Sequence, residues 1–242
     1  MRKAAKSTQS VKNLMNKVAT ACRILTRLGL MDFLGHVSAR VPNSNRVIFF
    51  RATSIFYPAS RMAILADMKG KLIKGSSNPP IEAPLHLCIY RKRSDVGSVV
   101  HMHSPAATSF AISGKKIIPV LNQGIEAVAS GVPIFKKPGL VDDDELGDAL
   151  GTALGNHAVC LMKNHGMVAV GGTVEEACLN AINLELQAKM NLLSLVSGQP
   201  QSIPPEILKR VADLHKSRAA TSKAWNYYAK LTAGSTGLRF HA

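Results

Sequence analysis

The chain has 242 residues, of which 46% are hydrophobic and 19% are charged. This length and this apolar fraction predict a folded protein with a substantial core and exclude a disordered chain. No apolar run approaches the roughly 20 residues that a helix needs to cross a bilayer, which excludes a membrane-spanning class. We expect a soluble, cytoplasmic protein that forms a single domain over residues 1–242, with a less regular C-terminal tail from about residue 203.

The formal net charge is +15, which makes nucleic acid a partner to consider. The lysines and arginines are dispersed, however, and no helix-turn-helix, zinc-finger or RNP pattern accompanies them. We therefore expect a small anionic substrate, and neither nucleic acid nor a membrane as a partner. The four cysteines lie in apolar segments without a CxxC pair, which is typical of buried thiols in a reducing compartment.

The first half of the chain alternates between helical and strand patterns. Residues 1–31 carry basic side chains and no acidic one, as transit peptides do, but their apolar residues recur at helical spacing and favour the first helix of the fold. Pro79 and Pro80 end the strand patterns and favour the start of a helix. The expected elements are a helix through residue 28, a hairpin of residues 35–42 and 46–51, a weaker hairpin over 63–75 and a helix over 80–93.

The second half repeats this alternation of helices and strands. Acidic residues open one expected helix at its positive end, and Thr173 with Glu176 forms a capping box for a longer one. The expected elements are a strand ending in a pair of histidines, a helix over 106–112, a strand over 116–120, a helix over 142–154, strands over 158–162 and 167–170, a helix over 174–196 and a further helical stretch in the tail.

The pair of histidines, His101 and His103, is the first feature that points to chemistry. Side chains of an extended strand alternate between its faces, so the two imidazoles point the same way. Two imidazoles on one face can bind a Zn, Mn, Fe or Co ion, but two ligands do not complete a site. An isolated pair of this kind is more often two polar residues on a wet face.

Four short motifs occur in order along the chain. They are Gly35-His36-Val37-Ser38-x-Arg40, Glu82-x-x-x-His86-x-x-Ile89-Tyr90-x-x-Arg93-x-Asp95-Val96, Val100-His101-x-His103 and Asn164-His165-Gly166. Together they resemble the class II aldolase and adducin family. The resemblance implies a three-layer α/β/α sandwich around a central, largely antiparallel sheet, and homotetramers with active sites between subunits.

The resemblance also implies a metal site. By position, its three ligands match His101, His103 and His165, and its acid/base carboxylate matches Glu82. Neutral imidazoles leave the ion its full charge, and three protein ligands leave positions open for substrate. We expect a divalent metal, with Zn²⁺ favoured over Mn²⁺, Co²⁺ or Fe²⁺. A carboxylate in a partly dry site can have its pKa raised toward the working range, so Glu82 is expected to shuttle the proton. The alternative is that Glu82 binds the metal in the empty site and is displaced by substrate.

The chain departs from the family's sugar-phosphate enzymes where they hold the phosphate. Gly35-His36 replaces Gly-Asn, residues 52–55 lack the Ser-Gly turn, and Pro79-Pro80-Ile81 replaces a pair of serines before Glu82. Proline lacks an N–H and isoleucine lacks a hydroxyl, so donors for a phosphate are missing there. The family's downstream tyrosine acid is also absent, because Leu121-Asn122-Gln123 stands in its region. The residues expected to contact substrate are His36, Ser38, Arg40, Thr53 and Ser54.

These losses favour a metal-dependent carbon–carbon lyase, either an aldolase or a decarboxylase. It would act through a metal-stabilised enolate on a small, non-phosphorylated hydroxy, oxo or aromatic acid. Three alternatives remain open: a sugar-phosphate aldolase or 4-epimerase, an Fe(II) oxygenase on the same fold, and an adducin-like interaction module without catalysis. His86 lies one helical turn after Glu82, either as a partner of the site or as an ordinary core or surface histidine.

Overall fold

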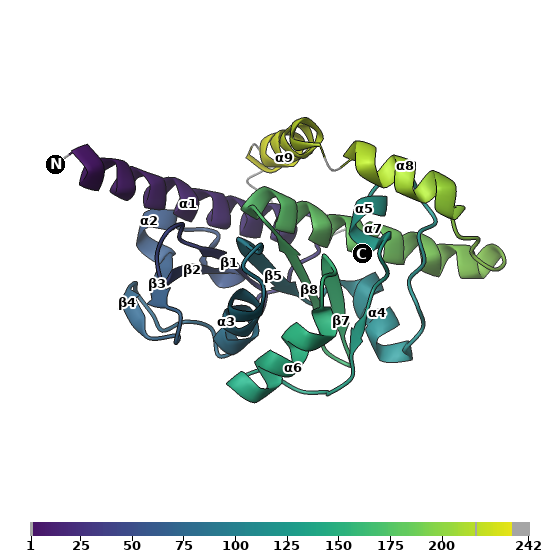
Figure 1. Cartoon of the computed structure of the whole chain (residues 1–242), viewed down its shortest axis with the longest axis horizontal. Coiled ribbons are helices and arrows are strands. Elements are labelled where there is room, and N and C mark those ends of the chain that lie inside the picture. Colours follow the sequence, from purple (N-terminus) through teal and green to yellow (C-terminus); the bar gives the residue numbers. More distant parts are fainter. Residues whose placement is uncertain (1, 216, 234–242) are drawn as a thin grey trace.

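The computed structural model describes residues 2–215 and 217–233 (Figure 1). The strands are β1 (His36–Arg40), β2 (Arg46–Arg51), β3 (Ile64–Asp67), β4 (Leu72–Lys74), β5 (Ser98–Met102), β6 (Ile134–Phe135), β7 (Val159–Met162) and β8 (Gly166–Gly171). The helices are α1 (Arg2–Arg27), α2 (Ala59–Met62), α3 (Ala83–Lys92), α4 (Pro105–Ser113), α5 (Ile125–Val128), α6 (Asp144–Leu154), α7 (Val174–Ser197), α8 (Pro205–His215) and α9 (Arg218–Ala233), with a 3-10 turn, η1 (Ala52–Ser54).

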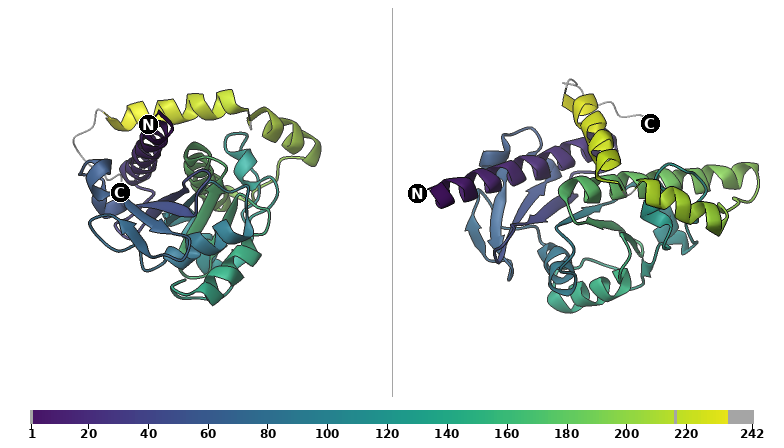
Figure 2. Two further views of the ribbon diagram at one scale, coloured as in Figure 1. Left: turned by 60° about the vertical axis from the view of Figure 1, so that its left-hand side comes forward. Right: turned by 45° about the horizontal axis from the view of Figure 1, so that its top comes forward.

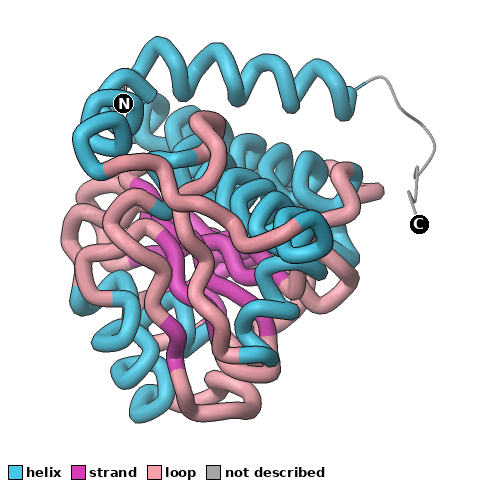
Figure 3. Tube along the Cα trace, turned by 90° about the vertical axis from the view of Figure 1, so that its right-hand side faces the viewer, coloured by secondary structure: helices cyan, strands magenta, loops and turns pink. Residues whose placement is uncertain are grey.

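The strands of the described residues form one eight-stranded sheet. Its order is β4-β3-β2-β1-β5-β8-β7-β6. Neighbouring strands run antiparallel except β6 and β7, which are parallel. Helices cover both faces of the sheet, which confirms the expected α/β class with a central, largely antiparallel sheet (Figure 3).

The two faces of the sheet pack against different helices, with α1 and α7 on one side and α3 and α6 on the other (Figure 1). Alternation along β1 divides its residues between these layers. Val37 and Ala39 enter the core beneath α1 and α7. His36 and Ser38 point to the opposite face, toward α3, and are 4% and 0% exposed. The polar side chains of β1 are therefore buried in the layer that also holds Glu82.

The tail after residue 203 contributes two helices, α8 and α9. Figure 2 shows α9 lying outside α1 and α7, and both contacts are present in the structure. Trp225 and Tyr228 of α9 pack against the core cluster beneath α1 and α7. Residues 234–242, where the sequence loses its pattern, lie outside the described residues. None of the described helices has the length and apolar character needed to cross a membrane.

The strand expected over residues 116–120 is wrong. This segment is not in the sheet, because side chains of α7 satisfy its backbone. Asn191 accepts from the Ile118 amide at 3.2 Å and donates to the Ile118 carbonyl at 2.7 Å, and Gln187 accepts from the Val120 amide at 3.1 Å. Two side-chain amides thus replace the neighbouring strand that the apolar pattern suggests.

Two helices begin later in the chain than expected, because a residue in the N-cap position precedes each of them. The helix expected from residue 80 begins at Ala83, with Glu82 in the N-cap position. The helix expected from residue 142 begins at Asp144, because the Asp143 side chain accepts from the Leu146 amide. The Thr173 cap is confirmed, although Glu176 accepts from Gly172 instead of completing a capping box with Thr173. Sequence patterns also miss α2, α5 and β6.

Candidate metal centre

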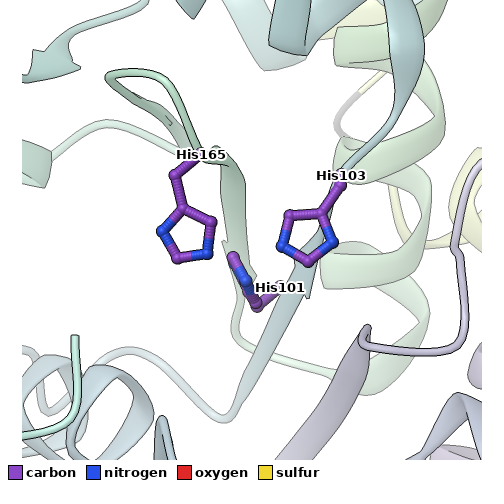
Figure 4. Close-up of side chains that lie close together, drawn as sticks. All are labelled: His101, His103 and His165. Carbon is purple, nitrogen blue, oxygen red and sulfur yellow. The ribbon is translucent and has the colours of Figure 1, made fainter. Parts of the chain in front are cut away.

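Three histidines converge at one end of the central strands. His101 lies in β5, His103 follows that strand, and His165 lies in the turn between β7 and β8. Figure 4 shows their imidazoles grouped around a common space. One ring nitrogen from each lies within 4.8 Å of those of the other two, so the three can bind one ion. The expected grouping of these residues is thus present in the fold.

The turn that carries His165 needs two unusual residues. Asn164 has a φ of 56°, in the left-handed region that asparagine tolerates better than most residues. A Cβ on Gly166 would lie 2.6 Å from the Met102 carbonyl oxygen and 2.7 Å from His103 Cδ2. Glycine therefore lets β8 approach the histidine pair closely, which is the physical reason for the Asn-His-Gly sequence.

Hydrogen bonds on Nδ1 fix how His101 presents its other nitrogen. Its Nδ1 lies 3.1 Å from the Met167 carbonyl oxygen, which only accepts, so Nδ1 carries the hydrogen. Burial also lowers the pKa of His101, which keeps the ring neutral. Its Nε2 then carries a lone pair, and this nitrogen is fully buried without a hydrogen-bond partner among the described residues. A metal ligand needs a lone pair of this kind.

His103 is oriented in the same way by a carboxylate. Its Nδ1 lies 3.0 and 3.1 Å from the two oxygens of Asp32, which accept its hydrogen and leave Nε2 free. A carboxylate behind an imidazole fixes the ring and makes it a stronger ligand. His165 has a buried Nδ1 without a partner, and its Nε2 lies 3.6 Å from Glu82 Oε1.

Glu82 directs its carboxylate into this group. The residue occupies the N-cap position of α3, yet its side chain does not cap the helix. Instead Oε1 accepts from the Val141 amide at 3.0 Å, and Oε2 lies 3.4 Å from His101 Nε2. Burial raises the pKa of Glu82, whereas its contacts with His101, His165 and the Val141 amide lower it to below its ordinary value. The histidine contacts lower the pKa only with positive charge on their side, which a cation bound to neutral imidazoles supplies as a protonated ring does. The net shift is opposite to the expected one, so Glu82 is an ionised base.

These residues fit a divalent cation. A lone pair on His101 Nε2 and a carboxylate oxygen 3.4 Å away repel each other unless a positive charge lies beside both. A cation bound to the three imidazoles supplies that charge without protonating any of them. Nitrogen ligands with a nearby carboxylate suit Zn²⁺, Mn²⁺, Co²⁺ or Fe²⁺. The donor set alone does not select among these ions.

Two further histidines extend the group inward. His36 of β1 is paired with His101 across the sheet, and their ring centroids lie 5.1 Å apart. His36 Nδ1 lies 2.7 Å from Nε2 of His86, whose Nδ1 lies 2.7 Å from Ser38 Oγ. Burial lowers the pKa of His86 to about 3 and that of His36 well below its ordinary value, so both rings are neutral. His86 is thus a buried partner of the site and not a surface histidine.

The other residues expected to contact substrate lie at different depths. Arg40 donates to the carbonyls of Tyr90, Val96 and Arg93 at the C-terminal end of α3, away from the histidine group. Arg51, the last residue of β2, is paired with His36, so η1 with exposed Thr53 and buried Ser54 follows directly beside the start of β1. The substrate contacts of Arg40, Thr53 and Ser54 stay predictions.

Sequence reasoning missed the groups that orient the candidate ligands. Asp32 lies 71 residues from His103 in sequence, and the Val141 amide lies 59 residues from Glu82. No spacing rule links positions so far apart. The one available signal is that Asp32 is the first acidic residue in a basic N-terminal segment and lies just before the Gly35-His36 motif.

Comparisons with known proteins identify relatives of this chain. Residues 16–192 match the Class II Aldolase and Adducin N-terminal domain. The 3,4-dihydroxyphthalate decarboxylase of Arthrobacter keyseri is 30% identical over 225 residues, which cover 87% of this chain and 90% of that protein. The L-fuculose phosphate aldolase of Methanocaldococcus jannaschii is 38% identical over 134 residues, or 54% of this chain and 68% of that protein.

The solved structures show the same architecture. An L-fuculose 1-phosphate aldolase from Glaciozyma antarctica superposes with a TM-score of 0.79 over 91% of this chain and 88% of its own, at 21% identity. The fold is therefore that of the class II aldolases, and the curated relatives named above are lyases. The family model matches residues 16–192, and the 30% identity to the decarboxylase extends over 87% of the chain. This chain therefore belongs to the class II aldolase and adducin family.

Proposed function

We propose that this protein is a divalent-metal-dependent decarboxylase that acts on a small aromatic acid of the 3,4-dihydroxyphthalate type. The observation that carries the proposal is the bare, buried Nε2 of His101 beside His103, His165 and an ionised Glu82. The substrate class comes from the Arthrobacter keyseri relative, whose 30% identity extends over most of both chains. A catechol with adjacent carboxylates is small, anionic and free of phosphate, as the missing phosphate donors require.

The chain's own residues account for the proton movements. Ionised Glu82 takes the proton of the hydroxyl next to the departing carboxylate and returns it to the ring carbon. The bond from that carbon to the carboxylate then breaks, CO₂ leaves, and its electron pair returns through the ring to the hydroxyl oxygen. The Val141 amide, 3.0 Å from Glu82 Oε1, holds the carboxylate in place. A bound divalent metal would supply a Lewis acid that stabilises negative charge on that oxygen.

We also propose that the ion is zinc and that the enzyme is a homotetramer, as the family resemblance implies. Light scattering on the purified full chain measures the assembly, and elemental analysis after expression in metal-balanced medium measures the ion. Zinc well below one equivalent per chain, with another divalent ion in its place, would contradict the choice of zinc but not the decarboxylase.

The test is a paired assay of the metal-loaded protein. We expect CO₂ release from 3,4-dihydroxyphthalate and no aldehyde release from L-fuculose 1-phosphate. Activity should disappear after chelation and return when the ion is restored. Uptake of oxygen with Fe²⁺ and a phenolic acid would indicate an oxygenase instead, and a metal-free protein without either activity would indicate an interaction module.

A sugar-phosphate aldolase is the second candidate, favoured by the 38% identity to the Methanocaldococcus jannaschii enzyme over 134 residues. Competition by inorganic phosphate separates the two candidates, because an aldolase site binds that group and the proposed site does not. The absence of a serine pair before Glu82 is the sequence feature against the aldolase.

A further inference from the structure

A buried chain of polar side chains connects the core to the candidate metal site. Tyr90 OH lies 2.7 Å from Ser38 Oγ, which lies 2.7 Å from His86 Nδ1, and His86 Nε2 lies 2.7 Å from His36 Nδ1. All four residues are at most 4% exposed. His36 Nε2, at the far end, lies 4.0 Å from Glu82 Oε2. The chain therefore runs from Tyr90 in the core to His36 beside Glu82.

The outer end fixes the direction of donation. His36 Nε2 lies 4.0 Å from Glu82 Oε2, and a carboxylate at that distance favours a hydrogen over a lone pair at the nitrogen. At the inner end, burial raises the pKa of the Tyr90 phenol, so the phenol keeps its hydrogen and can donate it to Ser38 Oγ.

The same direction then holds along the whole chain. With its hydrogen on Nε2, His36 accepts at Nδ1 the hydrogen of His86 Nε2. His86 then accepts at Nδ1 the hydrogen of Ser38, and Ser38 accepts the hydrogen of Tyr90. Each hydrogen of the chain thus has one acceptor.

The same assignment separates two overlapping groups of residues. His36, Glu82 and His101 also lie close enough together to be considered as ligands of one ion. A nitrogen that carries a hydrogen has no lone pair for a metal, whereas His101 Nε2 has one. His36 and Glu82 are therefore a donor facing an acceptor, and the ion belongs to His101, His103 and His165.

We propose that Tyr90, Ser38 and His86 are positioning residues that fix His36 as its Nε2–H tautomer, so that His36 donates a hydrogen bond to the substrate anion and does not bind the metal. The identity of that anion, an aromatic carboxylate, rests on the proposed function. The tautomer itself does not, because the hydrogen-bond chain is complete without substrate.

The test reads the tautomer directly. In zinc-loaded full-length protein labelled with ¹⁵N-histidine, correlation spectra report which ring nitrogens carry hydrogen, and the His36 signals are those lost in His36→Asn. We expect a hydrogen on His36 Nε2 and none on Nδ1. A hydrogen on Nδ1, or direct bonding of zinc to His36 Nε2, would overturn the proposal whether or not the protein is a decarboxylase.

Variants test whether the chain sets the tautomer. Tyr90→Phe and Ser38→Ala should each lower the fraction of Nε2–H and raise KM for 3,4-dihydroxyphthalate about threefold or more, with kcat changed less than KM. Loss of the donor itself in His36→Phe should raise KM about tenfold or more, the usual value of a hydrogen bond to a charged group. Circular dichroism confirms folding, and Ser38→Ala carries the test if Tyr90→Phe does not fold.

Ser98→Ala is the matched control. Ser98 is as fully buried as Ser38 and donates to the Ser38 carbonyl at 2.7 Å, but it lies outside the chain of donors. It should leave the tautomer and KM unchanged. If Tyr90→Phe and Ser38→Ala behave like Ser98→Ala, the chain does not position His36. If wild-type protein has the expected tautomer but no decarboxylase activity, the proposed function fails and the tautomer assignment stands.

Discussion

The histidines of the site form an outer group, His101, His103 and His165, and an inner group, His36 and His86, which differ in the partners of their nitrogens. In the outer group, His101 and His103 place Nδ1 on a carbonyl or carboxylate oxygen and leave Nε2 bare. In the inner group, both nitrogens of His86 are used by neighbouring side chains. The groups touch, since the His36 and His101 rings lie 5.1 Å apart. The partner of one ring nitrogen therefore decides whether the other nitrogen binds a metal or donates a hydrogen bond.

Removing an outer histidine should have the largest effect. His165→Ala deletes one of three candidate ligands, so zinc bound per chain should fall well below one equivalent. Decarboxylation should slow by about 1000-fold or more, because the ion accounts for several kcal/mol of transition-state stabilisation. Elemental analysis and initial rates measure both. His157→Ala, outside both groups, should keep the zinc and the rate. An equal loss in both variants would mean that His165 is not a specific metal ligand.

Glu82 faces both groups, and its replacement should separate binding from chemistry. Glu82→Gln keeps an acceptor for the Val141 amide but removes the proton acceptor. The rate should fall by about 100- to 10,000-fold, the usual contribution of a general base, while zinc stays bound. Single-turnover rates and metal content check this. Retention of most activity would assign the proton transfer to another group, with His36 the nearest candidate of the inner group.

A smaller effect is expected from Asp32, whose carboxylate holds His103 in place. Asp32→Asn keeps the shape but loses the charge that orients His103, so zinc affinity should weaken by about 10- to 100-fold. Competition with a chelator of known affinity measures the change. Asp148→Asn, which removes a carboxylate 3.7 Å from exposed Lys92, is the control and should leave affinity unchanged. If the two variants have the same zinc affinity, the contact of Asp32 with His103 does not strengthen metal binding.

The outer group was more predictable from sequence than the inner one. The one-residue spacing of His101 and His103 and the turn around His165 are local patterns, and local periodicity carries them. Asp32 and His103 lie 71 residues apart in the sequence, so no periodic pattern predicts their contact. His36 and Ser38 lie on one face of β1 as alternation requires, but only the packing of α3 brings His86 and Tyr90 to them.

The same limit explains the errors in the fold. Apolar alternation predicts a strand over residues 116–120, yet a strand needs a neighbouring strand, and α7 supplies Gln187 and Asn191 instead. The central hairpin and the β5, β7 and β8 strands were predictable because their pattern and their pairing agree. Where a side chain replaces a backbone partner, the sequence pattern alone cannot show it.

The smallest effect should be a pH dependence of stability, to which the two inner histidines and His101 of the outer group contribute. Folding lowers the pKa of His36, His86 and His101 below the ordinary 6.5 of histidine, chiefly through burial. The unfolded chain therefore binds more protons below about pH 6.5, so stability is complete above that pH and is lost as pH falls toward the His86 value of about 3. Each neutral histidine adds a slope approaching about 1.4 kcal/mol per pH unit.

Urea unfolding of the chelated protein between about pH 5 and 7 measures this slope. His86→Asn removes one titrating ring, so its free energy of unfolding should fall less steeply with decreasing pH than that of wild type, by about 1.4 kcal/mol per unit at most. Absolute stability can fall as well, because the variant alters a buried contact, but the slope is independent of that loss. Equal slopes would mean that His86 is protonated in the folded protein, and a protonated His86 could no longer accept the hydrogen of Ser38.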